Sequence, residues 1–103
     1  MKTTDGAGKM LSQIPVNLVK IGKKWTDMEI LRAGIIAELD AINLYEQLAA
    51  ATENEDLKKV LLEIAKEEKT YVGEFQALLL KVDKQQLEEL KKGAKEVEEL
   101  TGK

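Results

Sequence analysis

Two glutamates occupy positions where the surrounding pattern calls for apolar residues. Glu38 lies in one run that predicts a long helix, and Glu68 lies in a second such run. The apolar residues that share a helix face with these glutamates are Leu31, Ile35, Ile42, Tyr45 and Ala49 on the first helix, and Leu57, Leu61, Ile64, Tyr71, Phe75 and Leu78 on the second. A carboxylate in an apolar interior is costly unless it is protonated, paired or bound to a metal. One such glutamate on each of two adjacent helices therefore indicates half of a metal site.

The composition narrows the chemistry that is available. The chain has 103 residues, a net charge of −3, and neither cysteine nor histidine. The lack of cysteine excludes disulfides, thiolate sites and iron–sulfur clusters, and the lack of histidine excludes ordinary zinc sites and the usual general base. Charged residues make up 34% of the chain with mixed signs, which indicates a solvated helical surface without a basic patch for nucleic acid. The length predicts one domain with a modest core.

The first part of the chain differs from the rest. Residues 1–25 contain Gly6, Gly8 and Pro15 and show no clean apolar period, so we predict a flexible N-terminal arm there and a helical domain over residues 26–103. The arm has no apolar stretch followed by a small-residue cleavage site. No apolar run in the sequence approaches the roughly 20 residues that span a bilayer. We therefore expect a cytoplasmic protein that binds no membrane.

Capping signals predict where three helices begin. The two long helices are predicted over residues 27–51 and 55–81, and a third follows Asp83 and ends at Gly102. The start signals are the capping box of Thr26 and Glu29, the N-cap candidates Thr52 and Asn54, and the pair of Asp83 and Gln86. A short link between two long helices predicts an antiparallel hairpin.

A second apolar row lies beside the first on each long helix. On the first helix this row is Ile30, Gly34, Ala37, Ala41, Leu44 and Leu48. Two helices packed only on each other would leave much of this surface in water, whereas two hairpins related by a two-fold axis bury both rows. The predicted fold class is therefore all-α, a helical hairpin with a short third helix that dimerises into a four-helix bundle. Glu38 and Glu68 from two subunits would give four inward carboxylates, which can hold two metal ions as in di-iron carboxylate bundles.

Two segments resemble a known family. Residues 37–47, AELDAINLYEQ, and residues 65–75, AKEEKTYVGEF, are similar to the ferritin-like superfamily and, more narrowly, to the encapsulated ferritins. The resemblance covers about residues 29–102. It implies a ferritin-like hairpin, a ferroxidase centre built across a dimer, an annular decamer assembled from such dimers, and an encapsulin shell protein as partner.

The resemblance also implies roles for single residues. Glu38 and Glu68 occupy the two catalytic, metal-ligating glutamate positions. Tyr45 occupies the position of a tyrosine beside the ligands, and Asp40 falls near an acidic position close to the metal path. The family motif Glu-x-x-His is Glu68-Lys69-Thr70-Tyr71 here, so Tyr71 takes the place of the imidazole ligand on the same helix face.

The substitution at position 71 leaves three interpretations open. A tyrosinate can ligate ferric iron, as in some haem proteins, whereas a neutral phenol is a poor ligand for ferrous iron. Tyr71 is therefore a metal ligand, or a hydrogen-bond partner beside a site made of carboxylates alone, or the mark of a degenerate or engineered site.

Two functions follow from these interpretations. The first is a half-ferritin that oxidises Fe(II) to Fe(III) at a di-iron site, with other divalent metals as further candidates, for iron storage inside an encapsulin nanocompartment. The alternative is a catalytically impaired ferritin-like cargo module with a structural role. The chain is a ferroxidase in the first case and no enzyme in the second.

Overall fold

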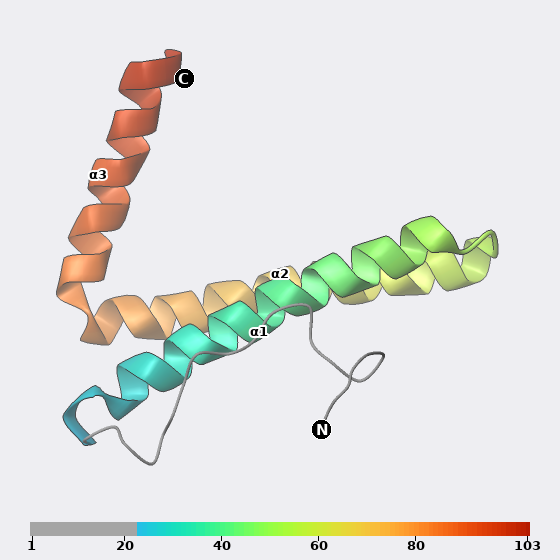
Figure 1. Ribbon diagram of the computed structural model, residues 1–103, viewed down its shortest axis with the longest axis horizontal. Helices are drawn as coiled ribbons and strands as arrows, with labels where there is room; N and C mark the ends of the chain where they lie inside the picture. Colours follow the sequence, from blue (N-terminus) through green and yellow to red (C-terminus); the bar gives the residue numbers. More distant parts are fainter. Residues whose placement is uncertain (1–22) are drawn as a thin grey trace, which may run out of the picture.

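The computed structural model describes residues 23–103, and it describes side chains from residue 26 onward. This part of the chain is all-α and consists of the helices α1 (Lys23–Ala51), α2 (Glu55–Val82) and α3 (Lys84–Thr101) (Figure 1). None of these helices is both long enough and apolar enough to cross a membrane. Almost all of the predicted arm, residues 1–25, lies outside the described residues, so the arm and its boundary stay predictions.

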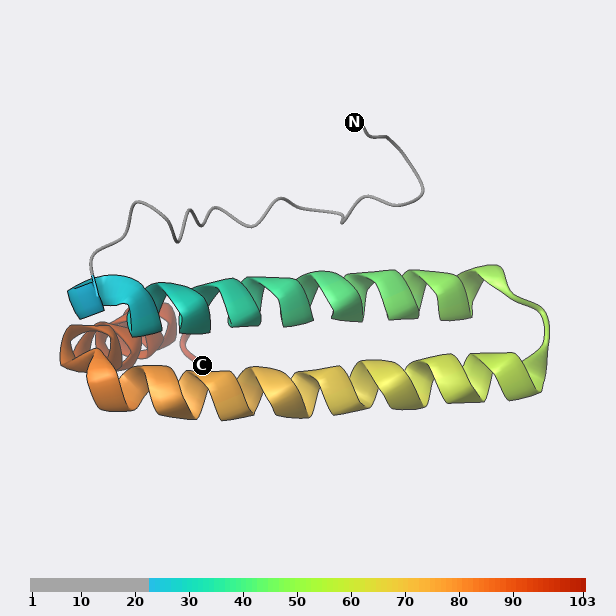
Figure 2. The same ribbon diagram turned by 90° about the horizontal axis from the view of Figure 1, so that it is seen from below.

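Helices α1 and α2 form the predicted antiparallel hairpin and lie side by side along their whole length (Figure 2). The turn between them is stabilised by two side chains that the sequence offered as caps. Asn54 is the N-cap of α2, and its Oδ1 accepts a hydrogen bond from the Leu57 backbone N–H at 2.9 Å. The Thr52 hydroxyl accepts one from the Asn54 backbone N–H at 3.1 Å. Thr52 therefore orders the turn while Asn54 caps the helix.

The predicted start of the first helix is wrong. Helix α1 begins at Lys23, so Thr26 lies inside it and the capping box of Thr26 and Glu29 does not form the helix start. An N-cap residue must have a non-helical backbone. Lysine favours helix, and residues 23–25 contain neither glycine nor proline that would end it before Thr26.

The contact between α1 and α2 is narrow and rich in small residues. Its most buried apolar side chains are Ile42 and Ala49 on α1, and Ala65 and Leu79 on α2. The inner row of α2 therefore runs through Ala65 and Leu79. The pattern had placed Leu57, Tyr71 and Leu78 on the buried face, and in the single chain they are 47%, 39% and 52% exposed. The two apolar rows of α2 lie next to each other, and the row with the small residue packs inward because it allows a close approach.

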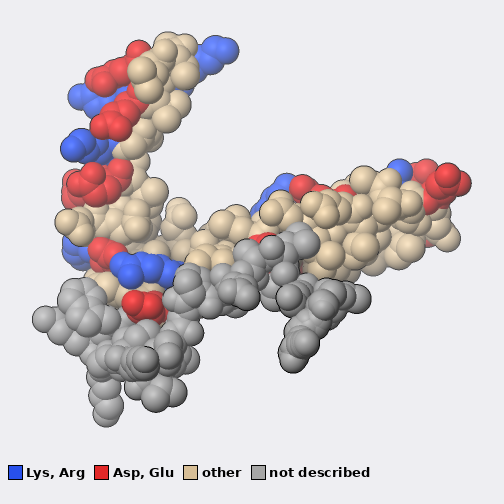
Figure 3. Space-filling view, viewed as in Figure 1, with Lys and Arg blue, Asp and Glu red and all other residues tan. Residues whose placement is uncertain are grey.

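Helix α3 leaves the hairpin at a steep angle and makes the molecule L-shaped (Figure 1). Among the described helices its backbone approaches only that of α2, near the junction. Its end is the predicted one, since Gly102 has φ of 75° and its backbone N–H donates to the Glu98 carbonyl at 2.8 Å. The charges of α3 gather mainly on its outer side, and uncharged atoms line the inner side of the L (Figure 3). Val97 and Leu100 of α3 are exposed.

Candidate metal centre

Two ion pairs lie along one edge of the hairpin. The Arg32 Nη2 lies 2.8 Å from Asp83 Oδ2, and the Lys69 Nζ lies 3.1 Å from Glu46 Oε2. The step from Arg32 to Glu46 on α1 equals the step from Lys69 on α2 to Asp83, the cap that follows α2, fourteen residues each. The two pairs are therefore equally spaced along both helices, and each is made by a long side chain that reaches along the hairpin.

The alignment on the other edge of the hairpin comes from a glycine. A Cβ built on Gly34 would lie only 3.2 Å from two ring carbons of Phe75, so the ring packs directly on the α1 backbone. One turn further along α1 is Glu38, and one turn back along α2 is Tyr71. Because antiparallel helices advance by the same 1.5 Å per residue, Glu38 and Tyr71 lie at the same level. Glu68 lies three residues before Tyr71, about 4.5 Å along the α2 axis.

These residues border an exposed apolar surface, which we call the open face. It comprises Ile30, Leu44 and Leu48 of α1 and Leu57, Tyr71 and Leu78 of α2, each between 39% and 52% exposed. Shallow grooves between α1 and α2 mark both of its ends. One groove is lined by Ile30, Leu31, Leu78 and Val82 among others, and the other by Leu48, Leu57 and Leu61 among others.

Helical periodicity places both glutamates between the buried contact and the open face. Glu38 lies one turn before the buried Ile42, and Glu68 lies three residues after the buried Ala65. Both side chains are half-buried in the single chain. Neither is fully enclosed. Within the described residues of one chain, no three His, Cys, Asp or Glu side chains come together as a metal-binding group.

The structure separates Asp40 and Tyr45 from this group. Asp40 is buried at 7% exposure, but it follows Glu38 by two residues and therefore points about 200° away around α1. Tyr45 is half-buried on the same side of α1 as Glu38, two turns or about 10 Å further along the axis. Of the five predicted site residues, one chain thus places Glu38 and Tyr71 at one level, with Glu68 one helical turn away from Tyr71.

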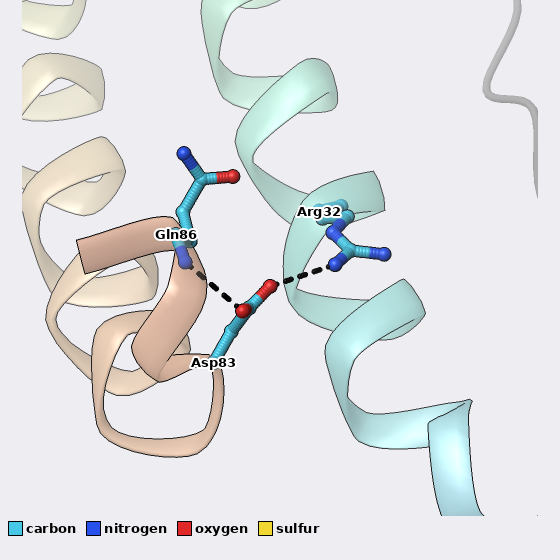
Figure 4. A network of polar contacts seen from close by, with 3 residues as sticks. All are labelled: Arg32, Asp83 and Gln86. Atoms are coloured by element: carbon cyan, nitrogen blue, oxygen red, sulfur yellow. Dashed lines mark hydrogen bonds and ion pairs between the residues drawn. The ribbon is translucent and has the colours of Figure 1, made fainter. Parts of the chain in front are cut away.

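A polar cluster on the opposite edge was not predicted. Asp83 Oδ1 accepts a hydrogen bond from the Gln86 backbone N–H at 3.1 Å, and Oδ2 accepts one from Arg32 at 2.8 Å (Figure 4). The backbone hydrogen bond from Gln86, and then the Arg32 guanidinium, hold the pKa of the Asp83 carboxyl below its usual value. The sequence predicted Asp83 as a helix cap but not its ion pair with Arg32. The one signal for that pair was that Arg32 is the only arginine in the chain.

Known proteins are similar to this chain over the three described helices. The sequence profile of the rubrerythrin family matches residues 29–102, which is most of the chain. The chain belongs to the rubrerythrin family. The crystal structure of the encapsulated ferritin domain from Pyrococcus furiosus matches this fold with a TM-score of 0.78 at 57% identity, and the match covers 90% of this chain and 97% of that one. The resemblance inferred from residues 37–47 and 65–75 is thereby confirmed, and so is the all-α hairpin with a third helix.

Two longer relatives place this rubrerythrin-family chain in context. A ferritin-like-encapsulin shell fusion protein of Pyrococcus furiosus is 57% identical over 96 residues, which are 90% of this chain and 28% of that protein. The encapsulin nanocompartment cargo protein EncC of Myxococcus xanthus is 41% identical over 69 residues, which are 64% of this chain and 53% of that protein. The chain therefore spans only about a quarter to a half of the length of these relatives.

The donor atoms on the open face and at its margin are oxygens, a donor type that iron accepts. Glu38 and Glu68 offer carboxylate oxygens and Tyr71 a phenol oxygen, and this chain has no thiol or imidazole. Carboxylates are hard donors that bind ferrous and ferric iron as well as manganese and magnesium. Two carboxylates from one chain leave most of the coordination of such an ion to other donors, which water or a second chain could supply.

Proposed function

We propose that two copies of this chain meet through their open faces and form a site that oxidises Fe(II) to Fe(III). Iron is the substrate, and oxygen or peroxide accepts the electrons. The observation that carries the proposal is the position of Glu38 and Glu68, both half-buried at one margin of an exposed apolar face. A two-fold axis through this face joins the hairpins into a four-helix bundle with four carboxylates facing one another.

The apolar residues around the glutamates supply the reason for association. A face with side chains of leucine, isoleucine and tyrosine that are about half exposed gains stability when a second copy removes it from water. The same burial lowers the dielectric around the carboxylates. Four carboxylates that face one another in such a site repel, and bound iron offsets that repulsion.

The relatives support a place for this activity. One is named as a fusion of a ferritin-like domain with an encapsulin shell, and another as encapsulin cargo. We infer that this chain stores iron inside an encapsulin nanocompartment, with the encapsulin shell protein as partner and with dimers that assemble into an annular decamer. The remaining alternative is a structural cargo module without turnover.

An anaerobic Fe(II) titration followed by oxygen exposure tests the proposal. We expect one iron per chain, bound only by the dimer, and oxidation when oxygen is added. Glu38→Gln and Glu68→Gln should each abolish binding. Glu46→Gln is the matched control, because Glu46 lies on the same helix as Glu38 but pairs with Lys69 on the other edge.

Three outcomes would contradict the proposal. A monomer in dilute solution with a cooperative melt would remove the shared site. Iron binding that survives both Glu38→Gln and Glu68→Gln would place the site elsewhere. A stable dimer that binds no iron would favour the structural cargo module instead.

A further inference from the structure

We infer that Tyr71 ligates iron only after oxidation, so that the site retains Fe(III) more tightly than Fe(II). This inference rests on the proposed dimeric carboxylate site and adds the oxidation state for which that site is selective. The ligand class is a hard trivalent cation held by carboxylate and phenolate oxygens.

Position singles out Tyr71 from the other tyrosine of the chain. The sequence contains two tyrosines, Tyr45 and Tyr71. The Gly34–Phe75 contact sets Tyr71 at the level of Glu38, and Tyr71 lies one turn from Glu68 on the same helix. Its side chain is 39% exposed on the open face of the single chain, so a partner copy would enclose it together with the glutamates.

Ionisation of Tyr71 would balance the charge that oxidation adds to the metal site. Two copies bring four carboxylates, and their four negative charges match two divalent ions. Oxidation of both ions adds two positive charges, which a site lined by apolar residues cannot leave uncompensated without a large cost. Two Tyr71 side chains, one from each copy, become negative by losing one proton each and restore neutrality.

The chemistry of the phenol makes this response depend on the charge of the metal. A phenol has an ordinary pKa of about 10, so near neutral pH it coordinates only an ion strong enough to displace its proton. In the ligation step the Oη–H bond breaks, an Oη–metal bond forms and the proton passes to water. No electron moves in that step, since oxygen or peroxide has already oxidised the iron. A divalent ion displaces the proton far less readily, so Fe(II) is held by the glutamates alone.

Redox-inert ions test this selectivity without turnover. Apo protein is titrated with Ga(III), supplied as its nitrilotriacetate complex, and separately with Zn(II). Ionisation of tyrosine is followed by ultraviolet difference spectroscopy, and proton release is followed at constant pH. Tyr71→Phe is the test variant and Tyr45→Phe the matched control, with circular dichroism to confirm that both are folded.

We expect Ga(III) to ionise one tyrosine per chain in the unaltered protein and in Tyr45→Phe, and none in Tyr71→Phe. Zn(II) should ionise none in any of them. Loss of a residue that hydrogen-bonds to a metal ligand typically weakens metal binding by roughly 10–100-fold. Tyr71→Phe removes a ligand itself, so it should weaken Ga(III) binding by at least that factor. The affinity for Zn(II) should change by less than about twofold. In iron-loaded protein exposed to oxygen, the visible phenolate-to-ferric band should vanish only in Tyr71→Phe.

Failure of this inference is distinct from failure of the proposed function. Ga(III) binding that requires Glu38 and Glu68 but ionises no tyrosine would overturn the role of Tyr71, with hydroxide supplying the missing charge, and would leave the carboxylate site intact. A tyrosine signal lost in Tyr45→Phe would also overturn it. Binding that is insensitive to both glutamates would overturn the site itself.

Discussion

The packing of Phe75 on Gly34 makes a quantitative prediction for Gly34→Ala. The new Cβ would lie 3.2 Å from ring carbons Cε2 and Cζ and 3.3 Å from Cδ2. Relaxed carbon–carbon contacts are about 3.5–4.0 Å, so the ring or the helix must move by a few tenths of an ångström. Overpacking of this kind typically costs about 1–3 kcal/mol. Alanine also favours helix over glycine by up to ~1 kcal/mol, which leaves a net destabilisation of about 0–2 kcal/mol.

Two other glycines provide matched controls. Gly73 on α2 and Gly93 on α3 also lie inside helices, and a Cβ at either position meets no atom within 4 Å. Gly73→Ala and Gly93→Ala should therefore stabilise the protein by about 0.5–1 kcal/mol through helix propensity alone. The contrast between Gly34→Ala and either control removes the shared propensity effect and isolates the contact with the ring.

Urea denaturation followed by circular dichroism measures this contrast. All variants are compared at one protomer concentration, because the stability of a protein that associates depends on concentration. If Gly34→Ala stabilised the protein as much as Gly73→Ala does, the ring of Phe75 would not rest on Gly34. The inference that Glu38 and Tyr71 lie at the same level along the hairpin would then be wrong. The two helices would be aligned differently, and other residues would face Glu38.

Three further predictions concern charges and ligands. The pKa of Asp83 is lower in the folded chain than in the unfolded chain, where it is about 3.8. Asp83 therefore stabilises the folded state fully above pH 3.8, and this contribution is lost as the pH falls through the folded pKa. In Asp83→Asn the free energy of unfolding should depend less on pH in this acidic range. Glu38→Gln and Glu68→Gln should preserve or raise the melting temperature of the metal-free protein, because they remove like charges from a shared site, and a large loss would reveal a structural partner for the carboxylate. Tyr71→His should raise Fe(II) affinity and the rate of iron oxidation in stopped-flow absorbance, because imidazole binds ferrous iron as a neutral donor; an unchanged rate would show that residue 71 does not contact the metal.

Local signals predicted most of the helix boundaries. Asn54, Asp83 and Gly102 each act through hydrogen bonds with residues at most four positions away, so the sequence alone carries the information. The capping box at Thr26 failed because the same residue types also occur inside helices, and the preceding residues decide whether the backbone is helical there.

The parts that could not be predicted depend on how helices pack. The pattern of α2 contains two neighbouring apolar rows, and the choice of Ala65 for the buried row depends on the closeness of α1, which no local signal records. The Arg32–Asp83 pair joins residues 51 positions apart. The glutamates stood out because they interrupt apolar rows, but their level relative to Tyr71 needed the contact between Gly34 and Phe75.

The way α3 projects from the hairpin leaves its apolar side uncovered in the single chain. Most helical stability in proteins comes from packing of an apolar face, and none of the 18 residues of α3 is buried. In a lone chain its backbone amides should exchange with deuterium progressively faster from the junction at Asp83 toward Gly102. When other copies cover its apolar side, protection should extend toward the C-terminal end of α3. Hydrogen exchange along this helix would therefore report, residue by residue, how much of the protein has assembled.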